Sequence, residues 1–318
     1  MIDGPDIGGL PFTGLQTFLG WGLESNLSGL GPNTLVAVGA PYDEGTPYAP
    51  GSRFGPAAIR AASMRLRFAS SDGLLFTDAG ARRHVQLGER GIDAGDATIF
   101  PRDQEATFAR IEQSVSTVTR SGAIPIVLGG DNSITYPTVK GLEQPPTILQ
   151  FDAHLDYGSG YFTRRHGNST PMRQLMREGF ARRIVHCGIR GLDNALEDLE
   201  ATEADGNIVI TSEEVRSGEA VARINEAAVS GAVYVSLDVD VFDPSVAPGT
   251  GYPEPGGITL PMLRPIFRQI ARTAEIIGCE VVEVSPGLDI NAITSLTAAQ
   301  AIVELLMSRA SSRLTEEQ

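Results

Sequence analysis

The sequence lacks several features that mark secreted and membrane proteins. It has only two cysteines, Cys187 and Cys279, and neither belongs to a Cys-x-x-Cys motif. Both lie inside apolar runs, so we expect buried, reduced thiols. No stretch reaches the roughly 18–20 apolar residues that a membrane helix requires, and residues 1–14 lack the basic start and apolar run of a secretory signal. These absences predict a cytoplasmic protein.

Positive charge is also scarce. The chain has 25 Lys and Arg residues against 39 Asp and Glu residues, which gives a net charge of −14. An acidic protein repels phosphate backbones and anionic lipids, so we expect neither nucleic acid nor a membrane surface as a partner. The charge is compatible with a small cationic ligand. With 318 residues and 42% apolar residues, the chain can bury a large core.

Short apolar runs alternate with longer amphipathic stretches along the chain. The predicted strands are Thr34–Gly39, Ile124–Leu128, Thr147–Phe151, Ile184–Gly188, Asn207–Ile210, Val233–Leu237 and Cys279–Val284. The predicted helices are Gln104–Arg120, Met172–Gly179, Ser212–Ser230, Leu260–Ala274 and Ser295–Arg309. Several strands are apolar throughout, which is typical of parallel strands covered on both faces. The alternation predicts an α/β fold with a mostly parallel sheet.

The pattern shows no linker and no internal repeat, so we expect residues 1–318 to form a single domain. Residues 1–33 are expected to form an N-terminal arm and residues 311–318 a frayed tail. The segment Pro244–Gly257 is rich in proline and glycine and directly follows a predicted strand. This position favours a shaped active-site loop over a flexible linker.

Three polar clusters each follow directly on a predicted strand. They are Gly129-Gly130-Asp131-Asn132-Ser133, Asp152-Ala153-His154-Leu155-Asp156 and Asp238-Val239-Asp240-Val241-Phe242-Asp243. Ligand sites in open parallel sheets form outside the carboxyl ends of the strands, so the three clusters can converge on one crevice.

Carboxylates at the ends of apolar strands are unfavourable unless they are paired or bind a metal, because desolvation and mutual repulsion both oppose their charge. Divalent cations neutralise such a group well. Oxygen ligands with one imidazole favour Mn²⁺, leave Ni²⁺ and Fe²⁺ open, and exclude a thiolate zinc site.

These motifs resemble those of the ureohydrolase family, the arginases and agmatinases, and are most similar to the agmatinase-like guanidine hydrolases. The resemblance extends from Val36 to Met307. It covers the three clusters together with Pro41–Thr46, Pro50–Pro56, His166-Gly167, Ala247–Gly251 and Glu283–Pro286. It implies a three-layer α/β/α sandwich, assembly into trimers or hexamers, and hydrolysis of a guanidino group to urea and an amine.

The resemblance also implies two divalent metal ions, Mn²⁺ or Ni²⁺, at the strand ends. Asp152 and Asp238 correspond to residues that bridge both metals. His154 and Asp240 would complete one site, and Asp156 would complete the other. A hydroxide held between the metals would attack the guanidinium carbon, and Asp156 would orient it.

Two further residues are candidates for catalysis. By the same resemblance, His166 would act as a proton shuttle that protonates the leaving amine. Glu283 lies in an otherwise apolar segment and needs a cationic partner, which a guanidinium substrate provides through a bidentate contact. A structural salt bridge with an arginine is the alternative for Glu283. We expect Asp243 to shape a loop rather than bind metal, and Arg53 to pair with acids of the protein itself.

One ligand position departs from the family. Asn132 stands where the family carries a histidine that binds the metal also held by Asp156. An amide oxygen is a weaker ligand for a transition metal than imidazole. The sequence therefore predicts a weakened first metal site beside an intact second one.

Smaller departures affect the mouth of the pocket. Ala49 stands where relatives usually carry arginine, the segment 166–171 is longer than the common form, and Gly287-Leu288 replaces a proline–aromatic pair. Arginine and agmatine are therefore not assumed as substrates, and a small or alkylated guanidine or a biguanide is the expected class.

Three functions remain open. The first is hydrolysis of a guanidino C–N bond by the chain itself. The second is the role of a metal-impaired subunit in a hetero-oligomer with an active paralogue, as in the metformin-hydrolysing members of the family. The third is metal-dependent hydrolysis of another amide or amidine on the same scaffold.

Overall fold

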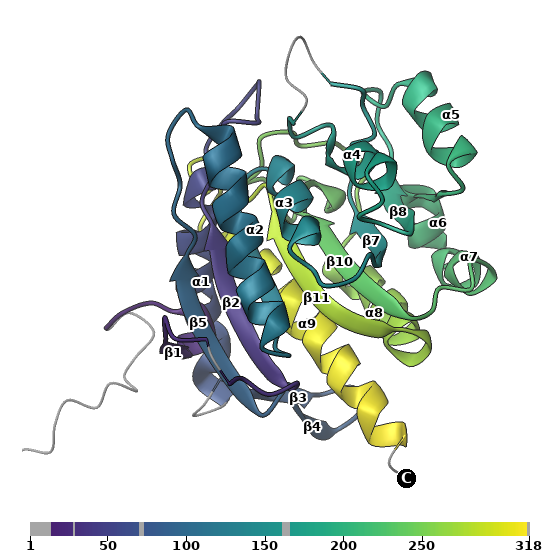
Figure 1. Cartoon of the computed structure of the whole chain (residues 1–318). Helices are drawn as coiled ribbons and strands as arrows, with labels where there is room; N and C mark the ends of the chain where they lie inside the picture. Colours follow the sequence, from purple (N-terminus) through teal and green to yellow (C-terminus); the bar gives the residue numbers. More distant parts are fainter. Residues whose placement is uncertain (1–13, 28, 70–72, 161–165, 317–318) are drawn as a thin grey trace, which may run out of the picture.

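A nine-stranded sheet forms the centre of the computed structural model, which describes residues 14–27, 29–69, 73–160 and 166–316 (Figure 1). Its strands lie in the order β1 (Gly22–Leu23), β5 (Arg90–Asp96), β2 (Thr34–Ala40), β6 (Ile124–Gly129), β11 (Glu275–Val282), β10 (Ala232–Asp238), β7 (Thr147–Phe151), β8 (Arg183–Ile189) and β9 (Ile208–Thr211). All neighbouring strands are parallel. A parallel sheet needs crossover connections, which here are mostly helical.

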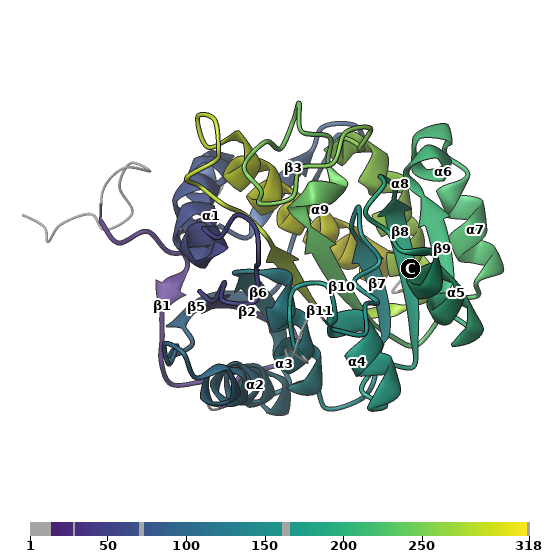
Figure 2. The same ribbon diagram turned by 90° about the horizontal axis from the view of Figure 1, so that it is seen from above.

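The helices form one layer on each side of the sheet, as Figure 2 shows. One side carries α2 (Gln104–Arg120), α3 (Thr135–Lys140) and α4 (Pro171–Arg177). The other side carries α1 (Gly55–Ser63), α8 (Leu260–Thr273) and α9 (Ile293–Glu316). Helix α5 (Leu196–Ala204) lies with α6 (Ser212–Ser217) and α7 (Ala220–Glu226) near β9. The predicted three-layer α/β/α sandwich with a parallel sheet is confirmed.

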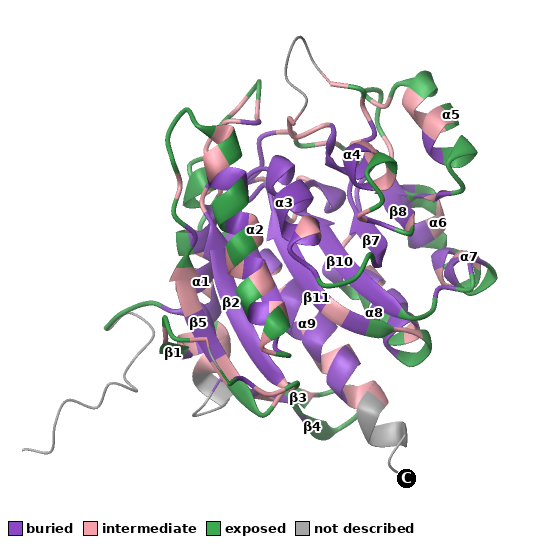
Figure 3. Cartoon of the chain, viewed as in Figure 1, coloured by how far each residue is buried: buried purple, intermediate pink, exposed green. Residues whose placement is uncertain are grey.

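The core lies on both faces of the central strands. Every residue of β2, β6, β7 and β10 is buried, whereas the helices of the outer layers show exposed faces (Figure 3). Burial on both faces explains why these strands are almost continuously apolar in sequence. The few polar residues inside them therefore need a specific explanation.

Several elements differ from the sequence-based expectation. Strand β5 was not expected, because its sequence Arg-Gly-Ile-Asp-Ala-Gly-Asp contains glycines and acids that are rare in strands. The helix expected over Ser212–Ser230 is two helices, because Gly218 adopts a φ of 87° and ends α6. A short antiparallel hairpin, β3 (Leu75–Asp78) with β4 (Arg83–Gln86), was also not expected.

The described parts of both terminal segments are folded, where the sequence predicts an arm and a frayed tail. Phe18 and Trp21 are buried, so this part of the expected N-terminal arm packs on the core. Residues 1–13 lie outside the described residues. Helix α9 continues to Glu316, through most of the segment expected to be a frayed tail, and residues 317–318 are again outside the description.

Cys187 and Cys279 are buried and free, as predicted. Within the part of the chain that the structure describes, no helix is both long enough and apolar enough to cross a membrane.

Candidate metal centre

The register of the sheet brings two of the polar clusters together. Leu237 of β10 pairs with Phe151 of β7, so Asp238 and Asp152 follow at the same level of adjoining strands. Asp238 also pairs with Val282 of β11, which places Glu283 at the next level. The carboxyl ends of three adjacent strands therefore present acids at one edge of the sheet, as expected for an open parallel sheet.

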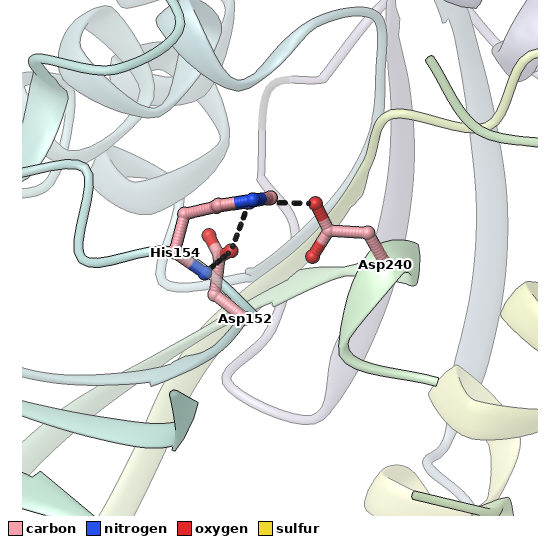
Figure 4. A group of neighbouring side chains, drawn as sticks. All are labelled: Asp152, His154 and Asp240. Carbon is pink, nitrogen blue, oxygen red and sulfur yellow. Dashed lines mark hydrogen bonds and ion pairs between the residues drawn. The ribbon is translucent and has the colours of Figure 1, made fainter. Parts of the chain in front are cut away.

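Asp152, His154 and Asp240 form the tightest group at this edge (Figure 4). Each offers a ligand atom, and these atoms all lie within 4.8 Å of one another. His154 Nδ1 lies 3.0 Å from Asp240 Oδ2 and 3.5 Å from Asp152 Oδ1. Among the described side chains, no other group has this combination of types and distances.

Backbone amides fix the two carboxylates of this group. The backbone N–H of His154 donates to Asp152 Oδ1 over 2.6 Å, and that of Ala153 donates to Asp240 Oδ1 over 3.0 Å. Asp238 accepts from the backbone N–H of Asp240 over 2.9 Å, so it caps the short turn Val239–Val241. Asp152 and Asp238 are therefore held by the backbone of their own segments, and Asp240 by the segment that follows β7.

Burial and crowding shape the electrostatics of the centre. Desolvation, with repulsion from Asp240, raises the pKa of Asp152 to about 6. Desolvation also raises the pKa of Asp238 well above its usual value, and Asp240 and Asp152 add to it. Burial opposes the charge of His154, but Asp240 and Asp152 together raise the pKa of its imidazole. In turn, His154 lowers the pKa of Asp240 despite the desolvation of that carboxylate.

These shifts indicate a site with too little positive charge. Among the described residues, His154 is the single ion-pair partner of Asp152 and Asp240. Carboxylate oxygens with one imidazole form a donor set that suits a hard or borderline divalent cation. The side chains present therefore fit a divalent metal ion.

Asn132 uses its amide differently from a metal ligand. Its Nδ2 donates to the carboxylate of Asp156 and lies 3.5 Å from Asp152 Oδ2. Its Oδ1 accepts from the hydroxyl of Thr135 over 2.8 Å. The oxygen is the only atom of the amide able to bind a cation, and it already uses one of its two lone pairs for this hydrogen bond.

Asp156 and Glu283 share an unusual backbone conformation. Their φ angles are 47° and 62°, in the left-handed region that residues other than glycine seldom adopt. Such strain is concentrated at functional sites. Desolvation raises the pKa of both carboxyl groups well above the usual range, and nearby acids, Asp152 for Asp156 and Asp131 for Glu283, add to the effect.

Glu283 connects β11 to the first polar cluster. Its Oε1 accepts from the backbone N–H of Asn132 over 3.0 Å, and its own N–H donates to the carbonyl of Gly130 over 2.8 Å. The structure gives no ion pair between Glu283 and any described arginine or lysine. Both interpretations of Glu283, a contact with a guanidinium substrate and a structural salt bridge with an arginine, therefore stay predictions.

His166 lies against aromatic side chains on the α2–α3 side. Its ring centroid is 4.5 Å from that of Tyr136 and 5.8 Å from that of Phe108. Its carbonyl accepts from Gln104 Nε2 over 2.8 Å. It does not belong to the Asp152, His154 and Asp240 group, and its role in proton transfer stays a prediction. Residues 161–165, which precede it, lie outside the described residues.

The loops around the centre behave as the sequence predicts. Asp243 accepts from the backbone N–H groups of Ser245, Gly256 and Gly257 over 3.0–3.1 Å, so it shapes the proline- and glycine-rich loop. Arg53 forms a salt bridge with Asp43 of its own chain. Both predictions are confirmed.

An aromatic pair lies beside the candidate ligands. The ring of Tyr252 packs edge-on against His154 with a centroid distance of 6.2 Å, and Tyr48, which is 75% exposed, lies 5.5 Å from Tyr252. The two loops are in close contact, because a Cβ atom added to Gly251 would lie 2.8 Å from the carbonyl oxygen of Ala49.

Sequence reasoning missed three residues around the centre. Gln150 of β7 donates to Asp152, His186 of β8 contacts Gln150, and Arg190 donates to the carbonyl of Asp240. The sequence did contain a signal for Gln150 and His186, since each is a polar residue inside an otherwise apolar strand. Arg190 follows β8 directly, as the acids follow β7 and β10.

Comparison with known proteins agrees with this arrangement. Residues 33–308 match the model of the arginase family. The chain is 33% identical over 303 residues to the guanidinopropionase of Pseudomonas aeruginosa, covering 93% of this chain and 92% of that protein. It is 32% identical over 290 residues to the proclavaminate amidinohydrolase of Streptomyces clavuligerus, covering 89% and 90% of the two chains.

Solved structures give the same result. The structure of the Streptomyces clavuligerus proclavaminate amidinohydrolase superimposes with a TM-score of 0.83 at 30% identity and covers 96% of this chain and all of that one. The structure of the Thermoplasma volcanium agmatine ureohydrolase gives a TM-score of 0.76 at 26% identity, with 96% and 98% coverage. The resemblance seen in the sequence is confirmed, and the chain belongs to the arginase family.

Proposed function

We propose that this chain hydrolyses a guanidino C–N bond to urea and an amine with two divalent metal ions, Mn²⁺ or Ni²⁺. The observation that carries the proposal is the convergence of Asp152, His154 and Asp240 at the carboxyl end of the sheet, with their ligand atoms within 4.8 Å of one another. The names of the relatives, an amidinohydrolase and a guanidinopropionase among them, support the same reaction class.

The proposed ligands divide between the two ions. His154 and Asp240 would hold one ion, Asp156 with Asn132 the other, and Asp152 and Asp238 both. When bound, such ions acidify water and so supply a nucleophile near neutral pH. Their charge also offsets the buried carboxylates, for which His154 is the one ion-pair partner among the described residues.

The remaining residues act on the substrate. Glu283 Oε1 is engaged by the backbone of Asn132, and Oε2 would accept an N–H of the guanidinium. His166 would deliver a proton to the leaving amine, and its stacking on Tyr136 orients its ring. Both roles rest on the resemblance to the family, and that of Glu283 also on its contacts with the first polar cluster.

The mouth of the site, as far as the described residues form it, favours a substrate without an acidic tail. The residue at position 49 is alanine, the guanidinium of Arg53 is engaged by Asp43, and the aromatic rings of Tyr48 and Tyr252 lie beside His154. Aromatic faces bind cations and alkyl groups, whereas a carboxylate tail requires a basic partner. We therefore propose a small or alkylated guanidine or a biguanide as the substrate.

A second function is favoured by Asn132. Because its amide donates to Asp156 and its oxygen is engaged by Thr135, the first metal site lacks a strong neutral ligand. The chain would then be a metal-impaired subunit that assembles with an active ureohydrolase paralogue, in a trimer or hexamer. Its contribution would be structural or regulatory.

Metal stoichiometry separates the two functions. The full chain is purified alone after growth with Mn²⁺ and Ni²⁺, and bound metal is counted by elemental mass spectrometry. Two ions per chain with urea release from alkylguanidines or biguanides support the self-sufficient hydrolase. One ion or none, with no urea release, overturns it and favours the impaired subunit.

A further inference from the structure

Two polar side chains lie inside the apolar strands next to the candidate metal centre. Gln150 of β7 and His186 of β8 are both fully buried and are partners in the strand register. Their neighbours along the two strands, Leu149 and Cys187 among them, are buried and apolar. A buried amide and a buried imidazole are unfavourable unless their hydrogen-bonding groups are satisfied. Gln150 and His186 are therefore expected to have a role other than core packing.

The contacts of Gln150 fix the direction of its amide. Its Nε2 donates to Asp152 Oδ2 over 2.7 Å and to the carbonyl oxygen of His154 over 3.2 Å. Both partners are oxygens without a proton to offer, so the nitrogen must be the atom facing them. Gln150 Oε1 consequently faces His186, 2.5 Å from its Nδ1.

The direction of this amide decides the tautomer of His186. Since Gln150 Oε1 can only accept, His186 Nδ1 carries the proton, and Nε2 is left as an acceptor. Thr202 of α5 lies 2.9 Å from Nε2 and donates its hydroxyl proton to it. Asn207 Nδ2 in turn donates to the Thr202 hydroxyl oxygen over 3.0 Å. Burial lowers the pKa of His186 to about 3. The ring is therefore neutral, as this series of hydrogen bonds requires.

The four hydrogen bonds run in one direction, from Asn207 and Thr202 through His186 and Gln150 to Asp152. Each group in the series accepts from the one before it and donates to the one after it, so reversing the bond between His186 and Gln150 would turn the Gln150 amide oxygen toward Asp152. Such directed outer contacts hold ligands of metal sites in position and tune their affinity.

We propose that His186 and Gln150 are positioning residues that orient the Asp152 carboxylate for metal binding. The proposal rests on the proposed function, because it assigns these residues to the metal centre. They touch neither substrate nor metal. They act by restricting rotation of the Asp152 side chain, so that its two oxygens keep a fixed direction toward the centre.

The test measures Mn²⁺ affinity rather than turnover. Free Mn²⁺ is followed by electron paramagnetic resonance while the full chain is titrated, in the natural sequence and in an Asn132→His background. His186→Leu removes the donor to Gln150 and is expected to weaken Mn²⁺ binding about 10–100-fold. His186→Asn keeps a side-chain N–H near the position of Nδ1 and is expected to recover most of the affinity.

Two controls separate positioning from general destabilisation. Val185→Ala removes a fully buried side chain from the same strand, next to His186, and should leave Mn²⁺ affinity within about twofold. Thr202→Val removes the donor to Nε2 with little change in volume. It should weaken binding, because the ring loses the partner that holds its Nε2 end, while Gln150 keeps the proton on Nδ1, which ¹⁵N-histidine NMR checks. If His186→Leu does not fold, Thr202→Val tests the positioning role in its place.

The outcomes are distinct. If Mn²⁺ binds and neither His186→Leu nor Thr202→Val changes the affinity, the positioning role is overturned while the proposed function stands. An equal loss in Val185→Ala also overturns it, because packing alone would then explain the effect. If neither the natural chain nor Asn132→His binds Mn²⁺, the proposed two-metal function fails and the positioning role fails with it.

Discussion

The side-chain nitrogen of Asn132 donates a hydrogen bond to the carboxylate of Asp156. The amide thus presents a proton toward an acid that is expected to bind metal. A histidine at this position could present a lone pair instead. Because the amide is neutral, it also leaves the repulsion between Asp156 and Asp152 only partly relieved.

The first prediction concerns this ligand. Asn132→His should raise the metal content of the purified chain toward two ions, because imidazole is a stronger ligand than an amide whose oxygen is engaged by Thr135. Elemental mass spectrometry measures the change. Asn132→Leu, which has a similar size and no ligand atom, should not raise the metal content. A natural chain that already holds two ions would show that the amide does not impair the site.

The second prediction concerns Glu280, a fully buried acid of β11. Tyr234 donates to its Oε2 over 3.2 Å, while its Oε1 has no hydrogen-bond partner among the described residues. Burial raises its pKa from 4.5 to about 7. The folded state therefore holds a proton that the unfolded state releases at lower pH, and the free energy of unfolding should fall as pH rises between these values.

Glu280→Gln should remove this part of the pH dependence and raise stability at pH 8 by about 1–3 kcal/mol. Urea unfolding at pH 5 and pH 8, with a chelator present, measures the difference. Glu275→Gln alters an exposed acid at the start of the same strand and should leave the pH dependence unchanged. The same slope in Glu280→Gln as in the parent would show that Glu280 is ionised in the folded protein.

The third prediction concerns Arg190, which joins two loops at the metal centre. Its guanidinium donates to the carbonyl of Asp240 over 2.5 Å, of Val241 over 3.1 Å and of Glu254 over 2.7 Å. Lysine cannot reproduce this fork of donors. Arg190→Lys should therefore cost about 2–3 kcal/mol of stability and speed amide hydrogen exchange over residues 243–257.

Arg216→Lys is a matched control for Arg190→Lys. Arg216 is largely exposed and donates to one carbonyl of the same loop, that of Gly256, over 2.5 Å. Its replacement should change stability by no more than about 0.5 kcal/mol. Equal effects of the two substitutions on exchange would contradict the joining role of Arg190.

The fourth prediction concerns substrate choice at the mouth. Ala49→Arg adds a cation next to Tyr48 and should raise kcat/KM for 4-guanidinobutyrate relative to an N-alkylguanidine about tenfold, by pairing with the carboxylate. Tyr252→Leu removes a ring that packs near His154 and should lower kcat/KM for the alkylguanidine a few-fold. Urea release measures both. A natural chain that prefers 4-guanidinobutyrate would contradict the proposed substrate class.

The sheet was largely predictable from sequence, and the reason is visible in its strands. Strands β6, β7 and β10 are apolar and buried throughout, so composition alone marks them. Strand β5 escaped prediction because Asp93 within it is buried against Arg60, 2.8 Å away, a pairing that only the folded chain reveals. Gly218, by contrast, is a local stop signal for a helix, and the prediction of one helix over Ser212–Ser230 passed over it.

The candidate site was predictable in its residues but not in its contacts. Strand ends followed by acids indicated Asp152 and Asp238, since parallel strands bring their carboxyl ends together. The direction of the Asn132 amide depends on Thr135 and Asp156, which no local pattern connects to it. The ring of His166 lies on Tyr136 because α3 packs there, which is a tertiary effect.

The order of strands has a consequence for biosynthesis. Strands β1, β5, β2 and β6 form one flank of the sheet and β7, β8 and β9 the other, while the last two strands of the chain, β10 and β11, lie between them. During synthesis the two flanks emerge first and have no direct pairing with each other. Asp152 can meet Asp240, and Asn132 can meet Glu283, only after the C-terminal quarter leaves the ribosome. The metal-binding edge is therefore completed last, and a chain that stops before β10 would display two unpaired inner strand edges, β6 and β7, which are sites of aggregation.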